Sequence, residues 1–225
     1  TGNHKKANEI FSLLIYVLIG IGLVFTVLGE LFLAPISGIL GADAAMLPYC
    51  IQYGRVILIA LVPFMLQNVF QSLLVTAERP QLGLYITIIS GVTNMILDAL
   101  FVAVWRLGVP GAAAATALSQ SIGGIVPLIY FLLPNKSRLR LGKTHFDMSS
   151  IVKACSNGAS EFMTNISMSI VNMLYNWQLM RLLGTNGVAA YGVIMYVTFI
   201  FAAIFIGYSM GSAPITGYHY GAGNK

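Results

Sequence analysis

Long apolar runs without Asp, Glu, Lys or Arg fill most of the chain, and short groups of Pro, Gly and polar residues separate them. A helix needs about 20 apolar residues to cross the hydrocarbon core of a bilayer, which is close to the length of these runs. Pro and Gly mark the turns, as in Glu78–Pro80, Gly108–Gly111 and Gly184–Gly187. The pattern therefore predicts six membrane-spanning helices, at residues 8–39, 48–77, 80–105, 111–133, 148–183 and 187–219.

The composition supports the same class of protein. Hydrophobic residues make up 57% of the 225 residues and charged residues only 8%. Soluble domains usually carry about 25% charged residues, so this chain has too few to cover a water-facing surface. We therefore expect an all-α polytopic membrane protein in contact with the lipid bilayer. The net charge of +5 does not indicate nucleic-acid binding, because the sequence has no basic amphipathic stretch with interleaved aromatic residues.

Basic residues are divided unevenly between the two sides of the predicted helices, nine against three. The positive-inside rule places the richer side in the cytoplasm, so both ends of the chain are predicted to be cytoplasmic, in a cell inner (plasma) membrane. The nine residues are Lys5, Lys6, Arg79, Lys136, Arg138, Arg140, Lys143, Lys153 and Lys225, and the three are Arg55, Arg106 and Arg181.

The connection at residues 134–147 is the only charge-rich one, and it predicts a boundary between two parts, residues 1–140 and 141–225. The chain begins at Thr1 without an initiator Met, and we expect it to be a fragment or a processed piece. Its first five residues, TGNHK, resemble its last five, GAGNK, which is weak evidence for a repeat. A cut at the same point in two successive six-helix repeats would produce this similarity.

Three polar residues lie near the turn at Leu107. Asp98 is nine residues before Leu107 and Thr116 nine after it, so two helical arms would bring them to one depth, about 13 Å from the turn. Asn94, four residues before Asp98, shares its helix face. One interpretation is a buried cluster that joins two helices through hydrogen bonds. The other is a cation site, for Na⁺ held by oxygen ligands or for a proton on Asp98. The spacing alone does not decide between them.

A second polar group forms a stripe on the predicted fifth helix. Its five members lie within about 100° of one another around the helix. Such a face indicates a water-filled substrate pathway, and the alternative is helix packing through amide hydrogen bonds. Gln67 on the second helix is a further candidate for the same pathway. The stripe consists of Asn157, Glu161, Asn165, Asn172 and Asn176.

Motifs for other chemistry are missing. The sequence has no G-x-x-x-x-G-K-[ST] phosphate loop, no catalytic Ser or Cys motif and no metalloprotease motif. Cys50 and Cys155 do not form a zinc-binding pattern. We therefore expect a protein that is not an enzyme and that holds no cofactor and no metal site.

Several motifs carry a resemblance to a known family. The run N-M-I-L-D-A-L-F at Asn94–Phe101 and the run G-V-P-G-A-A-A-A-T-A-L-S-Q at Gly108–Gln120 resemble the fifth and sixth helices of the multidrug and toxic compound extrusion (MATE) family. The closing run Gly211–Lys225 resembles the end of that family's eighth helix. Two stretches, Ser160–Asn165 and Asn172–Met180, resemble its MepA-like bacterial branch.

The resemblance implies that the chain holds helices three to eight of a twelve-helix, two-lobe transporter, and that the missing helices are its partners. It implies a cation-coupled antiporter, using Na⁺ or H⁺, that exports amphipathic organic compounds by alternating access. Asn94, Asp98 and Thr116 match the family's cation site, which an Asp outside this chain would complete. An essential seventh-helix acid of other branches aligns near Ser169, so that role is not transferred to Glu161.

Two alternatives remain at this point. One is a flippase of the same superfamily for a lipid-linked sugar, which predicts more basic residues along the cavity than this sequence offers. The other is a six-helix membrane scaffold without transport, which predicts that Asp98 and the stripe are buried against each other.

Overall fold

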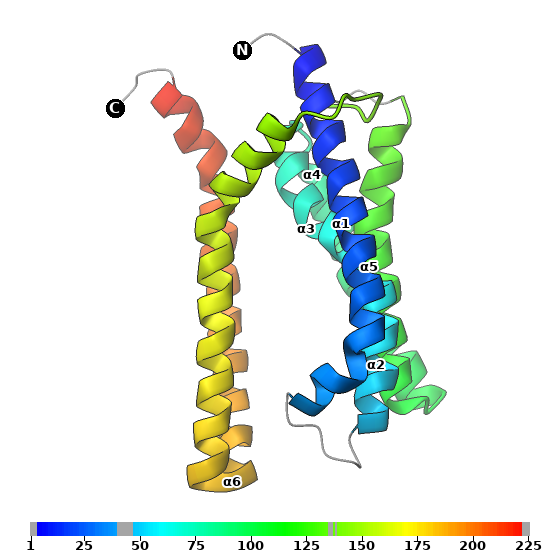
Figure 1. The fold of residues 1–225 in the computed structure, drawn as a ribbon, viewed down its shortest axis with the longest axis vertical. Coiled ribbons are helices and arrows are strands. Elements are labelled where there is room, and N and C mark those ends of the chain that lie inside the picture. Colours follow the sequence, from blue (N-terminus) through cyan, green and yellow to red (C-terminus); the bar gives the residue numbers. More distant parts are fainter. Residues whose placement is uncertain (1–3, 40–46, 135–136, 138, 222–225) are drawn as a thin grey trace. The chain divides into compact units, whose positions relative to one another are not determined.

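The computed structural model describes residues 4–39, 47–134, 137 and 139–221. All regular secondary structure in these residues is helical (Figure 1), which confirms the all-α prediction. The chain divides into two compact units, Thr1–Phe146 and Asp147–Lys225, and each is described by itself. The elements are α1 (His4–Ile39), α2 (Leu47–Ile59), α3 (Leu61–Thr76), α4 (Pro80–Asp98), the π-helical η1 (Ala99–Val104), α5 (Gly108–Leu132) and α6 (Met148–Gly221).

The core of the first unit lies where α1, α3 and α5 meet. Phe131 of α5 is fully buried, and its ring lies 5.1 Å from that of Phe11 and 5.5 Å from that of Phe70, centroid to centroid. Ile15 and Leu66 are buried beside these rings. Lipid tails are as apolar as these side chains, so inside a bilayer the cluster is stabilised by close van der Waals packing. This aromatic cluster therefore fixes the three helices at the end where the chain begins.

An extended segment, residues 139–144, closes this end of the unit, and we call it the strap. Its backbone N–H groups at Arg140 and Gly142 donate to side-chain oxygens of α1, over 3.2 Å to Asn8 and 3.0 Å to Ser12. The hydroxyl of Thr144 donates to the carbonyl of Glu9 over 2.7 Å. The boundary between the units, after Phe146, thus lies six residues beyond the predicted one at 140.

The predicted helix at 48–77 is bent into two pieces. α2 and α3 meet at an angle of 52°. Pro63 lacks an N–H, so the carbonyl of Ile59 loses the helical partner that it would have four residues later. A Cβ added to Gly124 of α5 would overlap the carbonyl oxygen of Pro63, so the two backbones cross in contact at the bend.

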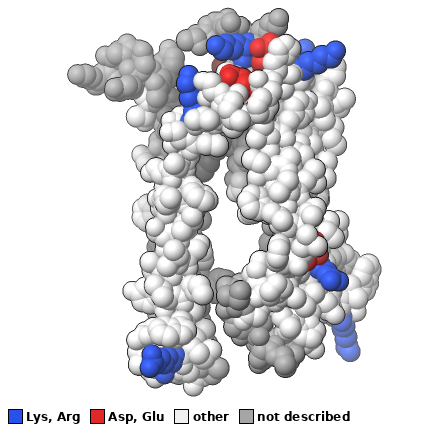
Figure 2. Space-filling model, viewed as in Figure 1, with Lys and Arg blue, Asp and Glu red and all other residues white. Residues whose placement is uncertain are grey.

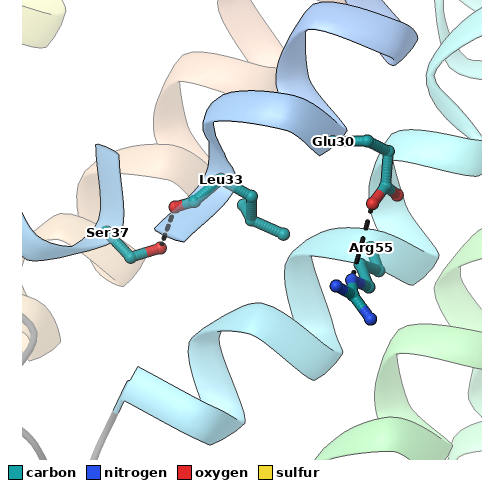
Figure 3. Close-up of polar contacts among 4 residues, drawn as sticks. All are labelled: Glu30, Leu33, Ser37 and Arg55. Atoms are coloured by element: carbon teal, nitrogen blue, oxygen red, sulfur yellow. Dashed lines mark hydrogen bonds and ion pairs between the residues drawn. The ribbon is translucent and has the colours of Figure 1, made fainter. Parts of the chain in front are cut away.

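Polar contacts join the C-terminal half of α1 to α2 (Figure 3). Nε of Arg55 lies 3.6 Å from Oε2 of Glu30, and the two side chains point toward one another from neighbouring helices. The hydroxyl of Thr26 donates to the carbonyl of Leu58, 3.1 Å away on the opposing helix. These contacts attach α2 to α1 below the bend.

Hydroxyl groups inside the helices mostly donate to the carbonyl four residues earlier. Ser37 donates to Leu33 over 2.8 Å (Figure 3), and Ser121 donates to Ala117 over 2.7 Å. Thr164 in the second unit does the same. Such a bond satisfies the donor without any partner from another helix.

The predicted helix at 80–105 does not stay α-helical to its end. η1 replaces its last turns, and the N–H of Trp105 donates to the carbonyl of Leu100 over 2.8 Å, five residues back. The rings of Phe101 and Trp105 stack at 5.2 Å. A π-helical segment of this kind often lies beside a functional residue, and Asp98 immediately precedes this one.

The second unit consists of the two arms of α6. The backbone of Gly184, with φ 66° and ψ −155°, is not helical, and the arms lie side by side from that turn (Figure 1). The hydroxyl of Tyr191 donates to Oδ1 of Asn172 over 2.9 Å, and its ring stacks on Tyr175 at 5.6 Å. The arms match the predicted helices at 148–183 and 187–219.

Asp147 caps the start of α6. Its carboxylate accepts hydrogen bonds from the N–H of Ser149 over 3.0 Å and from the hydroxyl of Ser150 over 2.6 Å. The hydroxyl of Ser150 is the largest of the influences that lower the pKa of Asp147 below its ordinary value of 3.8. The charged side chain therefore satisfies orphan donors at the helix start.

Among the described residues, four helical segments are long and apolar enough to cross a membrane, and the bent pair α2–α3 passes the same test. The first arm of α6 does not pass, because its polar residues lower its hydropathy. In Figure 2 most of the visible Lys, Arg, Asp and Glu side chains gather toward the ends of the helices, and one acidic and basic pair lies part-way along the first unit. The four segments are Lys6–Gly38, Pro80–Val104, Gly108–Leu132 and Asn186–Ser209.

Candidate functional site

A pocket of about 330 Å³ lies among α3, α4 and α5 in the first unit, and we call it the polar pocket. Nine of its eleven lining residues carry an amide or a hydroxyl group. Such a wall inside an otherwise apolar helix bundle indicates a place for water or a polar ligand. The lining residues are Phe64, Gln67, Asn68, Gln71, Thr87, Ser90, Gly91, Asn94, Thr116, Ser119 and Gln120.

On each helix, the helical spacing places the polar side chains on the face that lines the pocket. Gln67 and Gln71 of α3 are four residues apart, as are Ser90 and Asn94 of α4. Residues three and four apart share a helix face, so each helix turns one polar strip toward the pocket. The sequence thus builds the pocket from three strips that are far apart along the chain.

Hydrogen bonds fix the register of α4 against α5. The hydroxyl of Ser90 donates to the carbonyl of Ser119 over 2.7 Å, and both residues are buried. The hydroxyl of Ser119 donates in turn to the carbonyl of Thr116 over 2.8 Å. These hydroxyl donors are satisfied by backbone carbonyls and hold the wall in place, and the side-chain amide of Asn68 donates to the carbonyl of Phe64 over 2.8 Å.

Two buried side-chain oxygens in the described part of the chain have no hydrogen-bond partner: Oδ1 of Asp98 and Oε1 of Gln120. A buried oxygen without a partner costs about 1–3 kcal/mol, and more when the group is charged. An ion, a proton or a water molecule at these oxygens would remove that cost. The oxygens are therefore the strongest local indication of a binding site.

The structure brings together two of the three predicted cation ligands. Asn94 and Thr116 line the polar pocket, whereas Asp98 lies one helical turn beyond Asn94 and is not part of the lining. The predicted depth of Asp98 holds only for regular α-helices on both sides of Leu107. The intervening η1 has wider turns that rise less per residue, so Asp98 lies nearer the turn than the count implies.

The predicted substrate-pathway residues are divided between the units. Gln67 lines the polar pocket of the first unit. Asn157, Glu161, Asn165 and Asn176 are exposed on the first arm of α6 in the second unit. Asn172 is half-buried and accepts the hydrogen bond from Tyr191 of the other arm.

Asn172 thus takes part in a hydrogen bond between the two arms of α6. The side-chain amide of Asn165 donates to the carbonyl of Glu161 over 2.8 Å, within its own arm.

Three further residues of the pocket were not predicted: Ser90, Ser119 and Gln120. Gln120 lies four residues after Thr116, and Ser90 four residues before Asn94. Extending the helical spacing by one turn from each predicted ligand would have found both. In the described residues no group of three or more His, Cys, Asp or Glu side chains is placed to hold a metal ion.

Comparison with known proteins identifies the family of this chain. The MatE family model matches residues 1–100 and 162–225 of this chain. The chain belongs to the MatE family. It is 26% identical over 222 residues to the multidrug export protein MepA of Staphylococcus haemolyticus (strain JCSC1435), covering 97% of this chain and 48% of that protein. It is 25% identical, with the same coverage, to MepA of Staphylococcus aureus (strain MRSA252). The chain thus spans about half the length of the curated relatives it matches.

Solved structures share the fold. A multidrug resistance MATE family transporter of the MOP superfamily, in its inward-facing conformation, matches with a TM-score of 0.81 and 20% identity, over 99% of this chain and 51% of that one. A MOP superfamily transporter from Pyrococcus furiosus Vc1 (DSM3638) matches with a TM-score of 0.87 and 20% identity, over 99% and 50%. The MATE-type fold predicted from the motifs is therefore confirmed.

Proposed function

We propose that this chain forms part of a cation-coupled antiporter that exports amphipathic organic compounds by alternating access. Oδ1 of Asp98 carries the proposal, because it is buried without a partner at the end of a membrane-spanning α-helix. An acid inside the membrane is costly and is retained where an ion or a proton must be bound. The names of the relatives support export of drugs, since two staphylococcal relatives are multidrug export proteins.

The coupling step follows from the cost of the unpaired carboxylate. Na⁺ or H⁺ at Asp98 neutralises it, and Asn94 and Thr116 supply neutral oxygens from the adjoining polar pocket. A cation that prefers one arrangement of the helices shifts the transporter toward it, and an organic substrate that prefers the other shifts it back. Exchange of the two is the antiport cycle.

The complete transporter needs more than this chain. We propose that the rest of the full-length protein supplies the second half of the structure and the acid that completes the cation site. Organic substrates would meet Gln67 in the first unit and a stripe on α6 in the second. The membrane is the inner (plasma) membrane, with both ends of this chain in the cytoplasm. The stripe consists of Asn157, Glu161, Asn165, Asn172 and Asn176.

Drug accumulation in cells tests this proposal. Cells that express the full-length protein are loaded with a fluorescent cationic dye, with and without a Na⁺ gradient at fixed pH. Dye loss that depends on a Na⁺ or proton gradient, and that Asp98→Asn abolishes, is the expected result. Glu9→Gln, the same chemical change in α1 outside the pocket, is the control and should leave export unchanged. Export that survives Asp98→Asn with its ion dependence intact would overturn the coupling role.

A further inference from the structure

Gln120 continues the polar strip of α5 one helical turn beyond Thr116. It lies four residues farther from the turn at residues 105–107, about 6 Å along the helix. Asn94 likewise lies four residues from Asp98 on α4. Two of these four side chains, Asp98 and Gln120, each carry a buried oxygen that has no hydrogen-bond partner among the described residues.

The polar pocket adjoins three of these side chains. Its lining includes Asn94, Thr116 and Gln120 but not Asp98. The hydrogen bond from Ser90 to the carbonyl of Ser119 fixes the register of α4 against α5 beside Gln120, and it occupies the hydroxyl of Ser90. Among the residues that line the pocket, Gln120 is the one with a buried side-chain oxygen that lacks a hydrogen-bond partner.

We propose that Gln120 is a further ligand of the coupling cation, binding it together with Asp98, Asn94 and Thr116. The proposal rests on the proposed function, since it takes the cation of that function as its ligand. Because Oε1 of Gln120 has no partner, rotation of the amide about its terminal torsion breaks no bond at that oxygen. Gln120 lines the same pocket as Asn94 and Thr116, so its amide can turn this oxygen toward a cation held there.

The chemistry of this position selects the kind of cation. It offers two amide oxygens and a hydroxyl, all neutral, with the single carboxylate of Asp98. Divalent ions such as Ca²⁺ and Mg²⁺ are bound through carboxylates, often several, and these neutral groups suit a monovalent ion better. A proton needs only the carboxylate. Gln120 therefore belongs to a site for Na⁺ or a similar alkali cation.

Binding of Na⁺ to the purified full-length protein tests the role of Gln120. Calorimetric titration with NaCl at constant ionic strength compares the wild type with Gln120→Met, which keeps the volume but removes the amide oxygen. Losing one contact to a charged ligand should weaken Na⁺ binding by about tenfold or more. Gln52→Met, the same change at an exposed site on α2 outside the pocket, should bind Na⁺ as the wild type does.

Gln120→Glu keeps an oxygen at the position and covers the case in which the Met variant does not fold. Its Na⁺ affinity should depend on pH, rising as the new carboxyl loses its proton, and wild-type behaviour at every pH would overturn the inference. Unchanged Na⁺ affinity in folded Gln120→Met, when Asp98→Asn abolishes binding, would overturn it while leaving the proposed function intact. A wild type that binds no Na⁺ but exports dye with protons would also overturn it. A wild type that neither binds Na⁺ nor exports dye would refute both proposals.

Discussion

Gly124 offers the sharpest test of how the helices of the first unit pack. A Cβ at this position would overlap the carbonyl oxygen of Pro63 and lie 2.9 Å from both its carbonyl carbon and its Cα. These are backbone atoms at the bend between α2 and α3, so they cannot move aside as a flexible side chain does. Gly124→Ala must therefore separate α5 from the bend or shift the bend itself.

The size of the effect follows from two opposing contributions. Forcing one methyl group into a packed site costs about 1–3 kcal/mol. Replacing Gly with Ala inside a helix returns about 1 kcal/mol through helix propensity. The net change at Gly124 is thus a loss of up to about 2 kcal/mol. Gly20→Ala in α1 is the matched control, because a Cβ there meets nothing within 4 Å and the variant receives the propensity gain alone.

Thermal unfolding of the two purified full-length variants measures the difference. Gly124→Ala should unfold at a lower temperature than Gly20→Ala by at least about 1 °C, since the variants differ by the full packing cost of about 1–3 kcal/mol. Dye export by Gly124→Ala should fall as well, because the bend adjoins the polar pocket at Gln67. Equal melting temperatures for the two variants would refute the close crossing of the backbones.

Three further predictions concern the core, an ion pair and a helix cap. Phe131→Ala should cost about 3–5 kcal/mol by leaving a cavity among buried rings, and a melting temperature within 2 °C of the wild type would contradict this. Glu30→Gln should change stability by no more than about 1 kcal/mol, because the side chain of its partner Arg55 is 65% exposed, and a larger shift in the thermal melt would show a stronger pair. Asp147→Asn should remove a pH dependence at the start of α6. Since the hydroxyl of Ser150 lowers the pKa of Asp147, the cap stabilises the helix above pH 3.8 and is lost as the pH falls through the lowered value. The protection of the amides at residues 148–151, corrected for the intrinsic pH dependence of exchange, should therefore fall in acid for the wild type only, and an equal fall in the variant would contradict the cap.

The ends of the helices were predictable because the backbone chemistry of Pro and Gly favours these residues there. Pro80 is the first residue of α4, where its missing N–H costs nothing, and Gly184 adopts a positive φ at the turn of α6. The predicted range 148–183 ends at the residue before Gly184. The strap was predicted only as a charged loop, because its hydrogen bonds to Asn8 and Ser12 join residues more than 120 positions apart.

The site was predictable in its residue types and less so in its geometry. Asn94 and Thr116 could be paired by counting helical turns, and both line one pocket. The displacement of Asp98 could not be foreseen, since η1 looks like ordinary helix in the sequence. Gln120 was overlooked because an uncharged amide in a helix has no distinctive pattern until its burial is known. An unpaired polar group indicates a binding site only when its burial and its missing partners are known, and both require the three-dimensional fold.

The self-bonded hydroxyls of Ser37, Ser121 and Thr164 change how the polarity of this chain should be counted. A hydroxyl proton held by the carbonyl of its own helix presents only a weak dipole outward. Toward lipid such a side chain is nearly as apolar as alanine. Hydropathy values therefore overstate the part of the surface that must be hydrated. Mutational libraries aimed at ion or drug specificity can omit these positions and vary the amide side chains of the polar pocket and Asp98 instead.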